Sequence, residues 1–477
     1  MKNKIILSAM VASTLFATTA SALSVEERIA KLESIINAQQ KEINKLKEST
    51  EDIEEMDERL ETVETKSLTD KIKFGVGMRV EMNNYSNTYA DDSSYDADEI
   101  YRTKLNLNMK AKIADNLKFT GRLSMYKNWG DSTQRNTNND SMQGRKPDSS
   151  ALYVERAYLD WTLTEKGATL PLIMTLGRQP SGDGPSYQTK ENTTRKGTYD
   201  ALAADGAADG VVLTALVPST DTAIRLAYGT PNVLDNEAYS NQQMNYNGKD
   251  SSFKNTKVVG LFLDQNIPAL PFDNLVQVYA MSAKDLNADP AYTDQNKSTG
   301  PDDINVGDLT IAGAMFEANK IAGKLDLFAH YARSEAKPNG KLLDMGPLNG
   351  SHGLLTSTPN DISDKTGHAF WLGTRFHINR DWKVGAEYNK GSQNWYSFTS
   401  GSNDPLNKLA TRGDAVEVYV TKAINRYANL RFGYVDINYD YTGSGSHLGA
   451  PKEITSTLGT DAIKETENAY MSLNVLF

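Results

Sequence analysis

The feature that most constrains the fold is the alternation of apolar and polar side chains over unusually long segments. From residue 101 to residue 113 the odd positions, such as Leu105 and Leu107, are mostly apolar, whereas the even positions, such as Lys104 and Asn106, are polar. A period of two places the two sets on opposite faces of a strand. Strands of soluble proteins average about five or six residues, whereas a strand that crosses a membrane needs about 9 to 11. The pattern therefore indicates membrane-spanning strands.

The same alternation recurs along the chain and predicts sixteen strands. Their connections alternate between a few residues and about 17 to 33 residues, as expected for an antiparallel transmembrane barrel with short turns at one end and long loops at the other. The fifth, sixth, eighth and ninth patterns fit either face of the sheet. The predicted strands are residues 72–82, 101–113, 116–128, 151–164, 170–178, 210–217, 222–230, 256–266, 274–283, 308–318, 322–333, 367–378, 381–390, 413–423, 427–440 and 466–477.

Composition excludes several other classes of protein. The chain has 477 residues, 23% of them charged, and a mean hydropathy of -0.53, and the only near candidate for an apolar span is residues 5–17. A multi-span helical membrane protein needs several runs of about 20 apolar residues. The absence of cysteine excludes disulfides and zinc thiolate sites. No glycine motif for a nucleotide follows a strand.

The N-terminus has the composition of an export signal. Lys2 and Lys4 precede the apolar residues 5–17, and Ala20, Ser21 and Ala22 supply a small-residue cleavage site. We therefore expect residues 1–22 to be a signal peptide, with a retained anchor helix as the alternative. Losing the two lysines changes the net charge from -10 to -12, which argues against a nucleic-acid partner.

Residues 23–66 predict an α-helical coiled coil. Ser24 and Glu27 have the spacing of a capping box, and the segment contains 13 acidic and 7 basic residues on its solvated faces. We expect self-association through this seam, and the alternative is a single amphipathic helix packed on its own barrel. The seam consists of Ile29, Ile36 and Ile43 at a positions and Val25, Leu32 and Leu46 at d positions.

The last predicted strand ends in an aromatic residue. Met471, Leu473 and Val475 alternate with polar residues before the terminal Phe477. The chain here resembles Gram-negative outer-membrane porins, and most of all the poorly characterised porins with a periplasmic coiled coil before a sixteen-stranded barrel. The resemblance implies that residues 67–477 form the outer-membrane barrel and that the barrel-assembly machinery reads Phe477. It also implies contact with the lipid bilayer and lipopolysaccharide, and a homotrimer.

The third long loop, residues 179–209, matches by order the loop that folds inward in general-diffusion porins. The resemblance implies that this loop forms a constriction, although it lacks the glutamate-containing signature of those porins. The alternative is a surface loop with a tight turn at residues 181–184. The constriction candidates are Asp183, Lys190, Glu191, Arg195 and Lys196.

The polar face of the confident strands carries fourteen basic residues against five acids, which are Glu81, Asp160, Asp326, Glu387 and Glu417. Rings of Arg and Lys in a pore favour anions. We therefore expect a channel for small hydrophilic solutes with mild anion preference; the alternative is generic wall polarity without selectivity. The strongest pore-lining candidates are Lys73, Arg79, Arg102, Lys104, Arg122, Arg156, Arg225, Arg375, Lys383 and Arg431.

Aromatic residues fit the same barrel. Trp129, Trp161 and Trp382 lie near strand ends, where an aromatic girdle is expected. Trp371 shares its parity with Arg375 and belongs toward the pore in the alternative placement.

A barrel enzyme is the main alternative from another class of protein. His330 and His377 have lumen parity on adjacent strands near Asp326, which is compatible with an acid–base cluster. No nucleophile motif accompanies them, so we expect no enzyme and no cofactor. A second alternative is a tether that contacts the cell wall, or a sheath around a separate cytochrome, since the chain has no CxxCH motif. Acidic loops such as residues 91–99 could bind calcium but lack EF-hand spacing.

Overall fold

The computed structural model describes residues 33–34, 36–44, 71–129, 152–180, 184–195, 197–230, 239–240, 243–244, 256–287, 305–344, 351–399, 404–444 and 451–477. The chain divides into two units, residues 1–71 and residues 72–477. Among the described residues, no helix combines the length and the apolarity required to cross a membrane.

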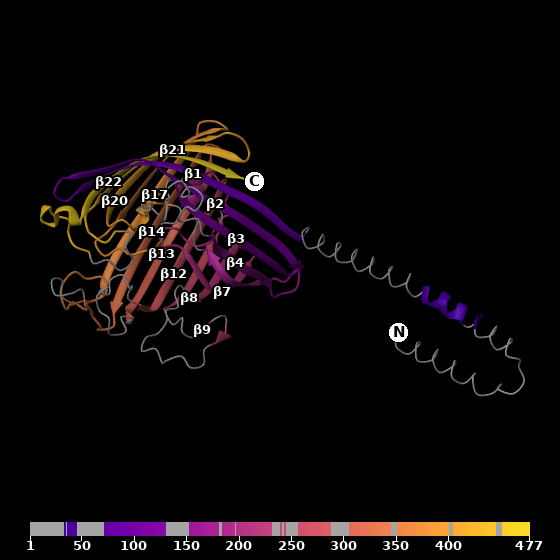
Figure 1. Ribbon diagram of the computed structural model, residues 1–477. Helices are drawn as coiled ribbons and strands as arrows, with labels where there is room; N and C mark the ends of the chain where they lie inside the picture. The colour runs from indigo at the N-terminus through magenta and orange to yellow at the C-terminus, as the bar shows by residue number, and fades with distance from the viewer. Residues whose placement is uncertain are drawn as a thin grey trace, which may run out of the picture. The chain divides into compact units, whose positions relative to one another are not determined.

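Within the described residues, sixteen antiparallel strands form one closed barrel, as the sequence predicts (Figure 1). Each strand pairs with its neighbour in the chain, and the last strand pairs with the first. The barrel strands are β1 (Ile72–Tyr89), β2 (Ser94–Ala114), β3 (Leu117–Asn128), β4 (Tyr153–Thr162), β5 (Leu172–Pro180), β7 (Ala207–Val217), β8 (Thr222–Thr230), β11 (Lys257–Gln265), β12 (Asp273–Asn287), β13 (Asn305–Ile321), β14 (Leu325–Pro338), β17 (Lys365–His377), β18 (Trp382–Gly391), β20 (Gly413–Ala423), β21 (Ala428–Tyr439) and β22 (Ile463–Leu476).

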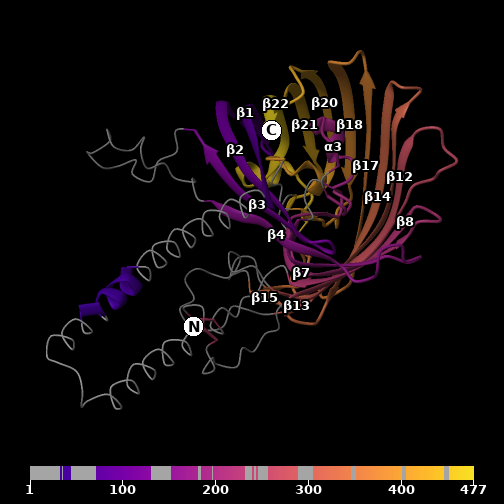
Figure 2. The ribbon, with the colours of Figure 1, turned by 90° about the vertical axis from the view of Figure 1, so that its right-hand side faces the viewer.

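The two ends of the sheet meet along β1 and β22. Val80 lies opposite Leu473, and the backbone of Val76 exchanges hydrogen bonds of 2.7 and 2.9 Å with Phe477. The C-terminus consequently lies beside β1 (Figures 1 and 2). Closure leaves no sheet edge, which is what allows a β-sheet to stand in hydrocarbon.

The outer and inner faces of the wall differ as the alternation predicts. Leu226, Leu261 and Phe432 are about half exposed, with exposed fractions of 53%, 53% and 46%. Side chains of the opposite parity, such as Glu417 and Arg431, are buried. The outer face is therefore an apolar, lipid-facing surface and the inner face is largely polar.

The first hairpin is longer than its alternation predicts. β1 continues to Tyr89 and β2 starts at Ser94, so residues 90–93 alone connect them where a loop of residues 83–100 was expected. A register shift between Asn83 and Tyr85 accommodates the polar part of this extension. Asp96 and Asp98 lie on β2 and not in a loop.

Short elements occupy the long connections. The inner ones are the helix α3 (Tyr187–Glu191), the strands β6 (Ala204–Asp205) and β19 (Phe398–Thr399), and the 3-10 helix η4 (Lys408–Ala410). Figure 2 shows α3 within the ring of strands. The others are β9 (Tyr239–Ser240) paired with β10 (Gln243–Met244), β15 (Leu343–Asp344) paired with β16 (Ser351–His352), and the 3-10 helix η5 (Ser456–Asp461).

An apolar cluster lies on the inner side of one part of the wall. Ile311 and Ala332 contribute from β13 and β14, and Trp371 contributes from β17. They pack with side chains from the connections, including Leu355 and Trp395, and all five are at most 2% exposed. The lumen is therefore filled on this side.

In the N-terminal unit, the structure describes residues 33–34, residues 36–44 and Lys71. Residues 33–34 and 36–44 are helical, and Ile36 and Ile43 are exposed by 59% and 46% within the single chain. The predicted signal peptide and the rest of the predicted seam, including Ile29 and Leu46, lie outside the described residues. Self-association through this helix stays a prediction.

Candidate functional site

Two connections enter the lumen and pair with each other. The first inward segment, residues 184–195 and 197–206, contains α3 and β6, and the second inward segment, residues 392–399 and 404–412, contains β19 and η4. β6 and β19 run parallel, with Ala204 opposite Phe398. The side chains that hold these segments against the wall define the candidate site.

Glu191 of the first inward segment contacts arginines from opposite ends of the sheet. Arg431 on β21 donates to the Glu191 carboxylate at 2.9 Å, and Arg79 on β1 also forms an ion pair with it. The Arg431 guanidinium further donates to the carbonyl oxygen of Lys190 at 3.1 Å. The end of α3 is therefore bound to the wall close to the seam between β1 and β22.

Glu417 on β20 joins the two inward segments. Lys190 donates to its carboxylate at 2.9 Å, and Lys408 of η4 donates to the same carboxylate and to Glu387 at 2.6 Å. Burial by itself lowers the pKa of Lys408, but the carboxylates of Glu387, Glu417 and Asp404 outweigh it and raise that pKa. Lys408 is fully buried and charged, and it links η4 to two strands.

Arg375, Lys383 and Asp326 form a third contact with the first inward segment. Arg375 donates to Asp326 through Nε at 2.7 Å and to the carbonyl oxygen of Thr189. Lys383 donates to the side chain of Asn192. The first inward segment is thus held inside the barrel by four predicted pore-lining cations, which are Arg79, Arg375, Lys383 and Arg431.

A further ion-pair group lines β1 to β4 and is linked to Glu191 through Arg79, which also lies 3.4 Å from Glu81. Arg102 donates to Glu81 at 2.6 Å, and Arg122 donates to Glu155 at 2.9 Å. Glu155 also lies 3.8 Å from Lys104 Nζ and 3.6 Å from Arg156 Nε. Each of these mid-wall basic side chains therefore lies beside an inward carboxylate, but Glu155 is shared by three cations.

The prediction of only five inward acids was wrong. Glu155 faces inward together with its neighbour Arg156 because a bulge in β4 places both opposite Arg122. A bulge adds one residue and breaks the period of two, so parity alone assigns Glu155 to the wrong face. Asp264 and Glu317 are also buried and inward: Asp264 pairs with Arg225, and Glu317 accepts from Gln188 at 2.6 Å.

The remaining predicted residues are placed as follows. Lys73 shares its face with Arg79 but is exposed toward the short-turn end of β1, and Arg195 of the first inward segment is exposed. Lys190 and Glu191 are buried inside the barrel, with exposed fractions of 7% and 6%. Asp183 and Lys196 lie outside the described residues.

The two predicted histidines do not share a cluster. His377 Nε2 lies 2.7 Å from Asp326, whereas His330 lies between Asp200 and Ser186, with Nδ1 2.7 Å from the Asp200 carboxylate and Nε2 2.8 Å from Ser186 Oγ. The sequence missed this second group because Asp200 and Ser186 belong to a connection with no strand parity. Ser186 Oγ also lies 3.1 Å from Glu317, so its hydroxyl has two acceptors within reach.

Two neighbouring cavities lie inside the wall along β4, β5, β7 and β8. A cavity of about 360 Å³ is lined by wall side chains that include Asp160, Thr214 and Arg225, and by residues 197–199 of the first inward segment. A second cavity of about 280 Å³ shares Leu216 and Arg225 with the first and reaches Pro218 and Asp221 in a short turn. We call these two the polar cavity and the turn cavity.

Three of the four tryptophans singled out in the sequence lie on the outer face of the barrel. Trp129, Trp161 and Trp382 are exposed by 55%, 42% and 37%, whereas Trp371 is buried inside and donates to Glu387 at 3.1 Å. In the described part of the chain no three acidic or histidine side chains are grouped as metal ligands. The aromatic residues thus follow parity, with Trp371 in its alternative, inward placement.

The fold defines a class: a closed sixteen-stranded antiparallel barrel of the outer-membrane type, with an apolar outer face and segments folded into its lumen. Residues 94–477 match the family described as "Protein of unknown function (DUF3373)", and the chain belongs to that family.

The chain is also similar to solved outer-membrane proteins. The Salmonella typhi OmpF complex with daunomycin is 11% identical, with 86% of this chain and 99% of that chain covered at a TM-score of 0.46. OprB of Pseudomonas putida at high pH is 10% identical, with 87% and 96% covered and a TM-score of 0.48. A trimer form of OmpT of Vibrio cholerae is 13% identical, with 85% and 99% covered and a TM-score of 0.44. No curated protein sequence is significantly similar to the chain.

Proposed function

We propose that this protein is an outer-membrane porin whose solutes pass along the inner wall of β4, β5, β7 and β8. The observation that carries the proposal is the polar cavity, which continues through Leu216 and Arg225 into the turn cavity. Barrels of this size leave an aqueous lumen unless segments fold into it. Here the inward segments fill the side of β13, β14 and β17, and the wall of β4, β5, β7 and β8 stays accessible.

Selectivity in this proposal is a weak preference for anions. Most mid-wall cations are paired with carboxylates, as in Arg102 with Glu81 and Arg225 with Asp264. Lys73, Lys110 and Lys118 are exposed toward the short-turn end and form no ion pair with another described residue. Because these solvated charges act across water, they bias the ion current only modestly, and salt screens them within about 8 Å at 0.15 M.

Planar-bilayer recording with a salt gradient tests the proposal. We expect discrete conductance steps and a reversal potential that indicates slight chloride preference. Thr214→Trp, which places an indole in the polar cavity, should lower the conductance severalfold. Leu213→Trp is the matched control because Leu213 lies on the same strand and is 39% exposed on the outer face. An absence of conductance in the folded wild-type barrel, or equal conductance in both variants, would contradict the proposed path.

The proposal gives no catalytic role to Ser186, His330 and Asp200. Their hydrogen bonds resemble the arrangement of a hydrolase triad, in which a histidine activates a serine and an acid orients the histidine. All three side chains are at most 2% exposed, and none of them lines the polar cavity or the turn cavity. A nucleophile needs room for the attacked carbonyl, so we assign these residues to anchoring of the first inward segment.

A fluorophosphonate probe distinguishes the two roles. An active serine hydrolase is labelled at its nucleophile, whereas we expect the folded wild-type barrel to stay unlabelled. Ser186→Ala should then show the same background signal. Stoichiometric labelling that disappears in Ser186→Ala would replace the channel proposal with an enzymatic one.

We also propose where the protein is located and how it is assembled. We place the barrel in the Gram-negative outer membrane with the coiled coil in the periplasm, in contact with lipopolysaccharide and the cell wall, and assembled as a homotrimer through the barrel-assembly machinery. A cytochrome sheath is disfavoured because the inward segments and the apolar cluster occupy the lumen that a second protein would need. A monomeric mass in mild detergent would contradict the trimer.

A further inference from the structure

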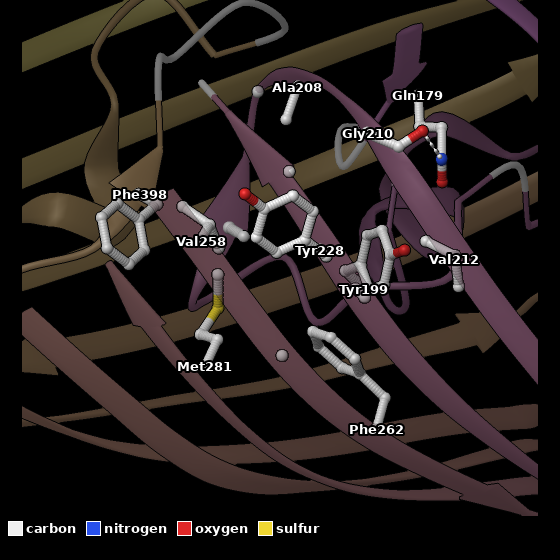
Figure 3. A pocket seen from close by; sticks show the side chains of 15 residues that line it. Gln179, Tyr199, Ala208, Gly210, Val212, Tyr228, Val258, Phe262, Met281 and Phe398 are labelled. Carbon is white, nitrogen blue, oxygen red and sulfur yellow. Dashed lines mark hydrogen bonds between the residues drawn. The ribbon is translucent and has the colours of Figure 1, made fainter. Parts of the chain in front are cut away.

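A third cavity adjoins the polar cavity, and its lining is mostly apolar. It is lined by inward positions of β7, β8, β11 and β12 and by the two inward segments (Figure 3). Its volume is about 160 Å³, and we call it the apolar pocket. The wall residues that line it on the inward face are Ala208, Gly210, Val212, Ala227, Gly229, Val258, Gly260, Phe262 and Met281.

This lining is unusual for the inside of a wet barrel. Inward positions of such strands are normally polar, whereas every one of the wall residues just named is apolar or glycine. At Gly260 a Cβ atom would lie 2.6 Å from the ring of Phe262, so the glycine allows that ring to lie along the wall. The small side chains keep open a space that larger ones would fill.

Aromatic side chains line the apolar pocket on several sides. Phe262 and Tyr199 lie with ring centroids 4.5 Å apart and planes tilted by 49°, and Phe398 of β19 also lines the space (Figure 3). Aromatic rings prefer offset or tilted contacts with one another, so a ring that enters this space can make such contacts with these side chains. The pocket thus offers apolar walls and ring faces together.

Three side chains with polar groups line the apolar pocket: Tyr228 comes from the outer face of β8, and the other two lie where the pocket meets the polar cavity. Gln179, Tyr199 and Val212 line both cavities. The amide of Gln179 is fixed by hydrogen bonds to the carbonyl oxygens of Thr175 at 3.3 Å and Gly210 at 3.2 Å. Burial raises the pKa of Tyr199 to about 12, so its hydroxyl stays protonated, and it forms no hydrogen bond within the described residues.

We propose that the apolar pocket binds the ring of a single-ring aromatic compound whose polar substituent lies in the polar cavity. A dry cavity of about 150 Å³ lined by apolar side chains holds one benzene, which matches this volume. The substituent then lies in a cavity lined by Tyr199, by the cations Lys118 and Arg225, and by the carboxylate of Asp160. The inference names the substrate class of the proposed porin and therefore rests on the proposed function.

Saturation-transfer NMR on the full-length barrel in detergent tests binding without requiring conduction. Benzoate is the probe, and acetate is the control that lacks a ring. We expect benzoate to bind the wild type at least tenfold more tightly than acetate. Ala227→Leu, which fills the pocket, should reduce benzoate binding at least tenfold, whereas Ala280→Leu, on the outer face of β12, should leave it unchanged.

A second variant distinguishes a filled pocket from a misfolded barrel. Phe398→Ala enlarges the pocket, so it should gain binding of 2-naphthoate over the wild type, and altered mobility on heating should show that each variant is a folded barrel. Equal benzoate signals in the wild type and Ala227→Leu would indicate partition into detergent and overturn the inference. If the protein conducts but does not bind benzoate, the pocket assignment is wrong and the proposed porin function is unaffected. If it binds benzoate but does not conduct, the proposed porin function is wrong and the pocket assignment is unaffected.

Discussion

Replacing Glu417 by glutamine should release the two inward segments and raise the conductance. Glu417 accepts hydrogen bonds from Lys190 at 2.9 Å and from Lys408, and its side chain is 2% exposed. In Glu417→Gln, Lys190 loses its carboxylate partner, whereas Lys408 keeps Glu387 at 2.6 Å. The first inward segment should therefore loosen more than the second.

The size of the effect follows from the burial of the pair. Removing one partner of a buried ion pair costs about 3–5 kcal/mol, and we take about 3 kcal/mol because the amide oxygen still accepts a hydrogen bond. At about 1.4 kcal/mol for each factor of ten, the inward arrangement loses roughly a hundredfold in relative population. The strand hydrogen bonds of the closed wall are untouched, so the barrel itself should stay folded.

Single-channel recording measures this population. Glu417→Gln should show frequent transitions to conductance levels above the wild-type level. The control is Glu335→Gln, since Glu335 also pairs with a lysine, Lys337, but at 3.6 Å and with a 32% exposed side chain. Lys190→Met in the Glu417→Gln background should restore part of the wild-type behaviour by removing the unpaired ammonium. Unchanged conductance in Glu417→Gln, together with unchanged thermal stability, would refute the anchoring role.

Four further outcomes are expected. The folded barrel should migrate differently before and after boiling on a gel, and deletion of Phe477 should slow assembly; identical mobilities, or normal insertion of the shortened chain, would contradict these two statements. The pKa of Lys408 is raised above the ordinary 10.5, so its ion pairs stabilise the inward arrangement at every pH below that value and weaken only as the pH rises through the higher folded pKa. The conductance should therefore stay constant from pH 7 to about 10. A rise in conductance by pH 9 would contradict the ion pairing of Lys408. Neutralising four mid-wall cations should leave Glu81 and Glu155 without their partners and move the reversal potential towards potassium selectivity. The substitutions are Arg102→Gln, Lys104→Gln, Arg122→Gln and Arg156→Gln. An unchanged reversal potential would show that these residues do not line the ion path.

The wall was predictable from sequence because parity is a local property of the chain. Each strand repeats its two faces at every second residue, so Leu226 and Arg225 were assigned to opposite sides without knowledge of their neighbours. Parity assigns the wrong face where an extra residue interrupts the two-residue repeat. The bulge in β4 is such a place, and it turns Glu155 inward. Parity also fails where a strand is nearly apolar on both faces, as in β11, whose inward Asp264 was missed.

The interior of the lumen was only partly predictable. The order of the connections pointed to residues 179–209 as the segment to consider, and Lys190 and Glu191 from it are buried in the barrel. The partners of these residues are distant in sequence, since Glu191 meets Arg431 and Ser186 meets His330. No pattern within either segment specifies such a pair, because the contact depends on which strands the closed barrel places opposite each other.

The parallel pairing of β6 with β19 constrains the order in which this protein can assemble. Ala204 and Phe398 belong to connections that are separated in the chain by all the strands from β7 to β18. Contacts between such distant segments form late, because the intervening chain must first lose its conformational freedom. The barrel wall must therefore be largely complete before its interior is filled, and a nascent barrel passes through a wider, leakier stage than the mature protein.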